Sequence, residues 1–351
     1  MDENNLDRKN TIKIKLSRFH DKYYKHLLIL PLIIFLLCFF YLFYFYTNTK
    51  DFIYKDLSLT GGTTVTFFYK GDLNNLKTKL GEGLEGLNVR EISDFMTGER
   101  KAIIIETKSN PEITKKVLEK ELGFQLNEEN SSIEFTEPSL GVGFFNQLII
   151  SLLIAFSFMG WVIFLIFGNN TKIKIFVGVI IITTAIINLS FLSQFNKNLS
   201  IFLSAAILLL SMFIYIFYSI PSIAIILSAF ADIFMTVSLL NFLGIEMSTA
   251  GIVALLMLIG YSVDTDILLT NRVLKNKEES LNRKIFSSFN TGITMTLTAI
   301  FSIGASLLVV RSYSPVLTKI FTVLLIGLCF DIINTWVTNV SLLKWYILKK
   351  G

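Results

Sequence analysis

The sequence predicts a polytopic α-helical membrane protein with about eight spans and one α+β domain outside the membrane. Of its 351 residues, 52% are hydrophobic and only 17% are charged, which is too apolar for an ordinary soluble domain. The apolar residues are clustered in stretches of about 20, enough to cross about 30 Å of hydrocarbon as helix. One long polar segment, residues 47–143, interrupts these stretches.

The eight predicted spans follow the apolar stretches. They are 27–46, 144–167, 175–193, 199–219, 221–243, 249–270, 291–310 and 318–343. Only the short sequence SQFNKN divides the third from the fourth. The first span has a long charged leader and no small-residue cleavage site after it, which predicts an uncleaved anchor and not a signal peptide. Residues 144–345 would then form the helical bundle.

The placement of basic residues predicts the orientation of the chain. Residues 1–26 are rich in Lys and Arg. On the same side, basic residues also occur at Lys172 and Lys174, between Arg272 and Lys284, and in the 346–351 tail. The short loops on the opposite side hold only Lys197 and Arg311. This asymmetry is the positive-inside pattern, which places both termini in the cytoplasm and residues 47–143 outside the cytoplasmic membrane. Because the charges follow the loops and not one surface, a nucleic-acid partner is disfavoured.

Residues 47–143 alternate between strand and helix patterns. Strand patterns occupy 53–70, 89–96, 101–108 and 131–138, with helical patterns over 71–87 and after the Asn110–Pro111 helix start. The order β-α-β-β-α-β is the split pattern of a ferredoxin-like sandwich. Both connections to the bundle contain glycines, at Gly61–Gly62 and within 139–143. These are hinge candidates, and tight turns are the alternative reading.

Four aspartates fall inside predicted spans, where each costs about 2.5–3.5 kcal/mol on insertion scales. We therefore treat Asp232, Asp264, Asp266 and Asp331 as ion-coupling candidates that face the bundle interior. The alternative is a structural role, in which each carboxyl only bonds to a nearby polar group and holds helices together. The candidate partners for that role are Ser228, Thr265, Asn334 and Thr335.

Helix geometry separates the neighbouring pair Asp264 and Asp266. At 100° per residue their side chains diverge by about 200°, so they cannot reach one partner. Asp264 shares a face with Gly260 and Tyr261, whereas Asp266 shares one with Ser262 and Thr270. Asp266 also lies nearer the cytoplasmic end, where partial hydration is expected. A buried carboxyl favours its neutral form, so protonation and deprotonation could bias a bundle with two states.

Motifs for other chemistry are absent. The sequence contains no GxxxxGK[ST] phosphate loop, GxSxG, HExxH or CxxC. The two cysteines and two histidines form no pattern of metal ligands. The sequence thus predicts no enzyme, no cofactor and no metal site. The energy for any transport would have to come from an ion gradient or from a partner protein.

Several motifs resemble one family. The sequence TGGTTVTF, with Thr60, Gly61, Gly62 and Thr63, resembles the D-F-x-G-G-T opening of the outer domain of SecF proteins, and TEPSLGVGFFNQ resembles the exit from that domain. NTGITMTLTAIFSI and FDIINTW are similar to later spans. The sequence GYSVDTDILLTNR is close to the archaeal form of SecF. It contains Gly260, Tyr261, Ser262, Thr265 and Arg272.

The resemblance covers most of the chain and places it in the resistance–nodulation–division superfamily. It implies six spans, a ferredoxin-like outer domain and pairing with a SecD-like subunit. It also implies that the pair assists the Sec translocation channel in exporting secretory polypeptides, driven in bacteria by protons. We expect no cofactor, and we expect the lipid bilayer to surround the helices.

The chain departs from this family in three respects. It has two extra crossings, which form an additional hairpin within about 168–219. Which segments are the insertion is open, because 199–219 could itself be the family's second span. The intramembrane Asp of bacterial members falls on Thr265, although Asp232 matches a family Asp. A bacterial Arg before the next span has no basic match near 287–290; Arg283 and Lys284 are the nearest.

The sequence therefore predicts a SecF-like subunit for protein export, with an ion gradient as the candidate source of power. One alternative is a passive structural or chaperone subunit without ion coupling. The other is half of a superfamily transporter for lipids or small solutes. Such transporters usually carry two halves in one chain with larger outer domains.

Overall fold

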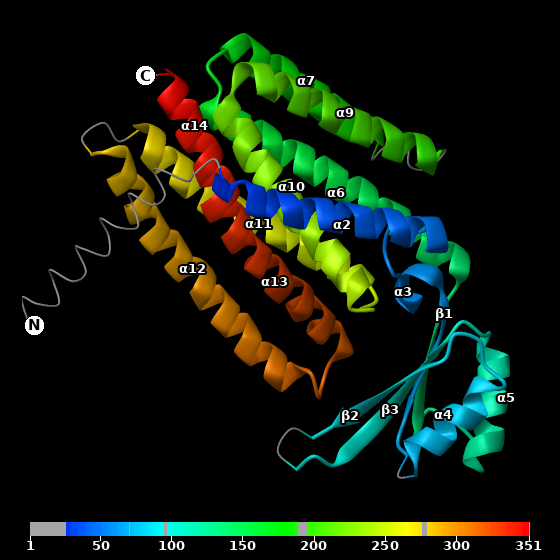
Figure 1. The fold of residues 1–351 in the computed structure, drawn as a ribbon. Helices are drawn as coiled ribbons and strands as arrows, with labels where there is room; N and C mark the ends of the chain where they lie inside the picture. Colours follow the sequence, from blue (N-terminus) through cyan, green and yellow to red (C-terminus); the bar gives the residue numbers. More distant parts are fainter. Residues whose placement is uncertain (1–25, 70, 95–96, 189–195, 276–278, 351) are drawn as a thin grey trace, which may run out of the picture.

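The computed structural model describes residues 26–69, 71–94, 97–188, 196–275 and 279–350. Most of the predicted basic N-terminal tail and the end of the predicted span 175–193 lie outside these residues. The described chain forms a bundle of long helices with a small antiparallel sheet at one end (Figure 1).

Seven helices in the described residues are long and apolar enough to cross a membrane. They are α2 (Ile29–Thr49), α6 (Pro138–Phe167), α9 (Lys197–Tyr218), α10 (Ile220–Phe242), α11 (Thr249–Lys275), α12 (Leu281–Val310) and a last helix. The last helix runs from α13 (Pro315–Ile333) through a π-helix, η2 (Asn334–Asn339), into α14 (Val340–Lys350). Helix α7 (Thr171–Ile187) has 17 residues and meets the undescribed segment 189–195.

Helices α10 and α11 form the centre of the bundle. One apolar cluster joins them to α6, α7 and α9, and a second joins them to α13. Helix α2 packs on α10, where Phe35 and Phe39 stack on Phe234. Small residues let helices approach closely: a Cβ on Gly327 of α13 would lie 2.3 Å from Leu258 of α11. The buried faces of α10 and α11 are therefore surrounded by protein on most sides.

Helix α12 begins ten residues before the predicted span 291–310. Its additional N-terminal turns carry Leu281 and Ile285, which pack against Val340 and Leu343 of α14. This apolar contact between two amphipathic helix ends explains why the helix extends past the stretch that is apolar all round. Both helix ends lie at the end of the bundle away from the sheet (Figure 1).

Helices α7 and α9 pack beside α6 at one edge of the bundle (Figure 1). Their contact contains a buried polar cluster, because Ser200 Oγ donates to Asn188 Oδ1 at 2.7 Å and Asn188 Nδ2 donates to Ser204 Oγ at 3.2 Å. Gly178 of α7 lies directly against the ring of Trp161 of α6. These contacts fix α7 and α9 to the bundle.

The sheet domain, residues 62–136, has the element order that the sequence predicts. It consists of β1 (Gly62–Phe67), α4 (Leu73–Gly81), β2 (Asn88–Ser93), β3 (Arg100–Thr107), α5 (Pro111–Leu122) and β4 (Ser131–Thr136). The sheet is antiparallel with strand order β2-β3-β1-β4. Its apolar face packs on α4 and α5, with Val65, Ile103, Ile105, Leu80 and Leu118 fully buried.

The connections to the sheet domain differ from the predictions. The first predicted strand starts only at Gly62, because Asp56 caps a short helix, α3 (Leu57–Thr60), through the Ser58 amide. The predicted hinge at 139–143 is wrong, because Pro138 starts α6 there. Gly141 instead allows α6 to approach Leu59 and Gly61 closely. Gly61 (φ 83°) and Gly62 (φ 147°) adopt backbone conformations that favour glycine.

We predict that Gly61→Ala destabilises the protein by more than the strain of its positive φ alone. That strain is about 1–2 kcal/mol for a residue with a Cβ. The new Cβ would also lie 2.4 Å from Pro138 Cα, so α3 and α6 would have to separate. Chemical unfolding in detergent, followed by tryptophan fluorescence, measures the loss. Gly98→Ala is the control, because Gly98 has a φ of 69° with no heavy atom near its Cβ position. An equal loss in both variants would contradict this account.

Candidate functional site

Three of the four candidate aspartates lie in the interior of the bundle. Asp232 of α10, Asp266 of α11 and Asp331 of α13 are all 0% exposed. They come from three helices that pack on one another, and Asp331 lies close enough to interact electrostatically with both Asp232 and Asp266. A single polar site has thus been assembled inside an apolar bundle from three distant parts of the sequence.

Asp232 is the best satisfied of the three carboxyl groups. Ser262 Oγ of α11 donates to its Oδ2 at 2.5 Å, and Asn334 Nδ2 donates to its Oδ1 at 2.7 Å. Asn334 was expected to be a local partner of an aspartate in its own span, but it bonds an aspartate of another helix. Because its two donors come from α11 and η2, the Asp232 side chain links three helices across the core of the bundle.

Asp266 and Asp331 each have one oxygen bonded and one without a donor. Asn339 Nδ2 donates to Asp266 Oδ1 at 2.8 Å, and Thr335 Oγ1 donates to Asp331 Oδ1 at 3.0 Å. The second oxygen of each carboxyl group is buried without a hydrogen-bond partner, as is Asn339 Oδ1. Because a buried acceptor without a donor is costly, these atoms favour a proton or a bound cation at the site.

No ion pair reaches these three carboxyl groups among the described residues. Taking an unpaired carboxylate from water into an apolar interior costs several kcal/mol even after relaxation. Protonation removes that cost and also supplies the missing donor. The site is therefore arranged to hold neutral carboxyl groups, and to respond strongly when one of them loses its proton.

The π-helix supplies the amide donors of this site. In a regular α-helix, side chains five residues apart point about 140° away from each other. The wider turn of η2 lets both Asn334 and Asn339 face the neighbouring helices, where they bond Asp232 of α10 and Asp266 of α11. Single π turns recur at functional sites because they reposition side chains in this way.

Asp264 lies outside the site. Its side chain is exposed together with Gly260 and Tyr261, whereas Ser262, Asp266 and Thr270 on the opposite face are fully buried. The predicted divergence of the two aspartates is confirmed. The expectations that Asp264 faces the interior and that Asp266 is partly hydrated are wrong, because the α10 and α13 contacts cover the Asp266 face and leave the Asp264 face uncovered.

The remaining motif residues have structural surroundings of three kinds. Thr60 Oγ1 donates to the Asp56 carbonyl and Thr63 Oγ1 to the Ser109 carbonyl, so this motif builds the entry to the sheet domain. Thr265 is buried, with its methyl group against Gly292 of α12. Arg272 lies beyond the predicted span 249–270 but still on a helix, because α11 continues to Lys275.

Arg272 points toward α12 from the end of α11. Its Nη1 donates to Ser287 Oγ at 3.0 Å and to Thr291 Oγ1 at 3.3 Å. The sequence lacks a basic residue at 287–290, and the structure shows that the preceding helix places a guanidinium group against that segment. Spacing along the sequence could not reveal this, because the two residues are brought together only by helix packing.

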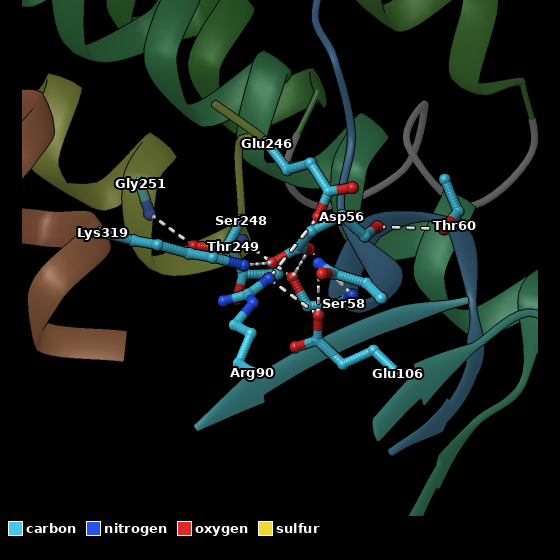
Figure 2. Close-up of polar contacts among 11 residues, drawn as sticks. Asp56, Ser58, Thr60, Arg90, Glu106, Glu246, Ser248, Thr249, Gly251 and Lys319 are labelled. Atoms are coloured by element: carbon cyan, nitrogen blue, oxygen red, sulfur yellow. Dashed lines mark hydrogen bonds and ion pairs between the residues drawn. The ribbon is translucent and has the colours of Figure 1, made fainter. Parts of the chain in front are cut away.

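Sequence reasoning missed Asn339 and the junction between the sheet domain and the bundle. Asn339 is a polar residue in an apolar span and lies five residues after Asn334, a spacing that matches no regular face of an α-helix. The junction includes Asp56, Arg90, Glu246 and Lys319, whose charges interact with one another across the fold (Figure 2). No local pattern connects these four positions.

Residues 184–349 match the family described as "Protein export membrane protein SecD/SecF, C-terminal". This region contains α9 to α14 and therefore every residue of the buried polar site. The resemblance to SecF is confirmed. The SecF of Methanocaldococcus jannaschii is 48% identical over 147 residues, which cover 40% of this chain and 52% of that protein.

Other archaeal relatives give a similar picture. The SecF of Methanothermobacter thermautotrophicus is 44% identical over 40% of this chain and 51% of that protein, and the SecF of Pyrococcus furiosus is 42% identical over 39% and 46%. The matched segment thus spans about half the length of these SecF relatives.

Solved structures show the same fold over most of the chain. The crystal structure of SecDF from Thermus thermophilus, a translocon-associated membrane protein, has a TM-score of 0.57 at 16% identity and covers 93% of this chain and 38% of that one. SecDF in a super-membrane-facing form has a TM-score of 0.50 at 16% identity, over 94% and 39%. The helical bundle and the small sheet therefore share their arrangement with part of SecDF.

We predict that Asn334→Ala destabilises the protein by about 1–3 kcal/mol, because Asp232 Oδ1 would be buried without its donor. Chemical unfolding in detergent micelles measures the loss. Asn290→Ala is the matched control, since the Asn290 side chain is exposed on α12, and it should stay within about 0.5 kcal/mol of the unsubstituted protein. A loss in Asn334→Ala no larger than in the control would show that the amide does not support the site.

Proposed function

We propose that this chain is a SecF-like, non-enzymatic membrane subunit that assists the Sec channel in exporting secretory polypeptides. The observation that carries this proposal is the coincidence of two features in residues 184–349. This region matches the SecD/SecF family, and it holds three buried carboxyl groups that pair with no basic side chain among the described residues. A subunit that only scaffolds other proteins has no need for such costly groups in its core.

Ion coupling is the proposed role of the buried site. A proton entering the site neutralises Asp266 or Asp331 and satisfies an unpaired oxygen, whereas its departure leaves a charge that neighbouring helices must accommodate. Because Asp232, Asn334 and Ser262 tie α10, α11 and the last helix together, such a change alters how these helices pack. The ion gradient would thereby drive a change in how these helices pack.

A SecD-like subunit is the proposed partner. Asp264 lies on the uncovered face of α11 and has no hydrogen-bond or ion-pair partner among the described residues. A carboxylate on a lipid-facing helix surface is costly, so this face needs protein or water against it. A second helical bundle of the same family would cover this face, and the SecDF structures support that arrangement.

The proposed topology follows the charge asymmetry of the loops. The sheet domain would lie outside the cytoplasmic membrane as a ferredoxin-like domain, with both termini in the cytoplasm. The bundle would have eight spans, with α7 and α9 as the additional pair. Helix α6 supports this choice, because it follows the sheet domain and packs on both α10 and α11, whereas the main contacts of α7 are with α6 and α9.

We predict that Asp266→Asn and Asp232→Asn abolish the gradient-dependent part of export. An amide keeps the shape of the carboxyl group and cannot exchange a proton. The assay is translocation of a secretory protein into vesicles that contain the Sec channel, this chain and its SecD-like partner, with and without an imposed ion gradient. The gradient-independent rate should stay within about twofold, and Asn290→Asp serves as a matched surface control.

Two results would contradict the proposal. Unchanged gradient-dependent export in both aspartate variants, with intact complexes by size-exclusion chromatography, would favour the passive scaffold. Failure of a SecD-like chain to co-purify from native membranes, together with gradient-driven movement of lipids or solutes, would favour the superfamily transporter.

A further inference from the structure

Helices α12 and α13 leave a hollow between them at the end of the bundle nearest the sheet domain (Figure 1). This hollow, which we call the groove, has a volume of about 420 Å³. It is lined by Ala305, Ser306, Val309, Val310, Leu317 and Phe321. Because this lining is apolar apart from one hydroxyl group, the groove belongs to the part of the helices that contacts hydrocarbon.

The groove lies beside a run of small residues in α12. Gly304, Ala305 and Ser306 follow one another there, and small residues in membrane helices usually let a neighbouring helix approach closely. A Cβ built on Gly304 would instead have only Leu325 of α13 within 4 Å outside its own helix, at 3.8 Å. An empty apolar space forfeits van der Waals contacts, so hydrocarbon from the surroundings is expected to fill it.

A second hollow adjoins the groove at the turn between α12 and α13. This polar cavity has a volume of about 300 Å³ and lies between the turn and strands β2 and β3. The lining of the groove ends at Val310 of α12, and the lining of the cavity begins at the next residue, Arg311. On α13, Leu317 lines the groove and Thr318 lines the cavity. The two hollows therefore meet at the turn.

The polar cavity has an excess of positive charge. Arg90, Arg311 and Lys319 line it together with a single acidic side chain, Glu91. Arg90 and Lys319 pair with carboxylates, and Glu91 pairs with Arg100. Arg311 is exposed and forms no ion pair among the described residues. Its guanidinium group is therefore available to an anionic ligand.

The turn itself has the side chains of a membrane–water interface. Ser312, Tyr313 and Ser314 line the cavity next to Arg311. Lys101 of β3 lies over the Tyr313 ring, 5.7 Å from its centroid, so the sheet domain covers the turn from the other side. Tyrosine is enriched at the level of lipid headgroups, because its ring is apolar and its hydroxyl group is polar. The polar cavity is thus at the height of the headgroups.

Arg311 stands at an end of the bundle where basic residues are scarce. The short loops on this side hold only Lys197 and Arg311. A structural alternative is that the guanidinium group interacts with the dipole of α12, whose C-terminal end it follows. That role requires neither a polar cavity beside the group nor an apolar groove below it.

We propose that the groove and the polar cavity together bind one lipid with an anionic headgroup. The headgroup phosphate pairs with Arg311, since a guanidinium group can donate to two phosphate oxygens at once. One hydrocarbon chain of the lipid lies in the groove against Leu317 and Phe321. This inference rests on the bilayer around the helices, and it does not depend on protein export or on ion coupling.

A lipid chain fits the groove better than a partner helix does. Close helix pairs in membranes use small residues spaced four positions apart. The residues four positions before and after Gly304 are Ile300 and Leu308, and the bulky Leu308 side chain is 67% exposed. A helix about 10–12 Å across would be held away from the groove by such side chains. A flexible hydrocarbon chain passes between them.

The test counts lipids bound to the full chain by native mass spectrometry. The protein is titrated in detergent micelles with phosphatidylglycerol or with phosphatidylcholine that has the same acyl chains. The unsubstituted chain should bind one phosphatidylglycerol at least about fivefold more tightly than phosphatidylcholine, because one cation close to the headgroup contributes a factor of this order. The melting temperature in the same mixtures should rise more with phosphatidylglycerol.

Four variants make the test specific. Arg311→Gln should lose the preference for phosphatidylglycerol and still bind phosphatidylcholine. Ala305→Phe fills the groove and should weaken the binding of both lipids, and Ser306→Leu should do the same with a smaller side chain. Lys197→Gln is the matched control, because it removes one positive charge from the same end of the bundle at the start of α9. It should behave as the unsubstituted chain.

Three outcomes would overturn the proposal. A preference for phosphatidylglycerol that persists in Arg311→Gln would remove the headgroup from the polar cavity. A loss in Lys197→Gln as large as in Arg311→Gln would assign the preference to the general charge of this surface. Unchanged binding of both lipids in Ala305→Phe and in Ser306→Leu would leave the groove to a protein partner.

Discussion

The structure depends on one constraint: three carboxyl groups are enclosed in an apolar bundle, and no basic side chain among the described residues pairs with them. The neighbouring side chains supply uncharged hydrogen-bond donors in place of cations. Ser262, Asn334, Thr335 and Asn339 each give one hydrogen bond, and two carboxyl oxygens remain without any. Such a site is stable when its carboxyl groups are neutral and strained when they are charged.

The same constraint explains the irregular last helix. A continuous α-helix could aim Asn334 at Asp232 but would turn Asn339 away from Asp266. The π turn at Asn334–Asn339 lets one helix serve two neighbours. Because a π turn is held by the packing around it, a change in the charge of either aspartate is expected to act on the geometry of the last helix as well as on local hydrogen bonds.

Much of the fold could be predicted from the sequence, because long apolar stretches and the β-α-β-β-α-β pattern are local signals. The divergence of Asp264 and Asp266 also followed from helix geometry alone. Helix geometry could not predict which of the two aspartates points to the interior, because that depends on where α10, α12 and α13 pack around α11. The Arg90–Glu246 ion pair and the Arg272 contact with α12 could not be predicted from local patterns either, because each joins residues from separate segments that come together only in the folded chain.

The two polar regions of the molecule are connected by rigid helices. The buried site lies within α10, α11 and the last helix. The ion pairs of Glu246 and Lys319 lie at the ends of these helices next to the sheet domain. Under the proposed ion coupling, a change in packing at the buried site would act along these helices. The Asp264 face on the opposite side of α11 is exposed in this chain.

The central claim is that the buried site holds a protonated carboxyl group at neutral pH. Infrared difference spectroscopy of the full chain in lipid, as pH is raised, measures this directly through the C=O stretch of protonated carboxyl groups. The account predicts a band of protonated carboxyl at neutral pH that disappears on alkalinisation and is weakened in Asp266→Asn. A spectrum without such a band at neutral pH, or one that Asp266→Asn and Asp331→Asn both leave unchanged, would contradict it.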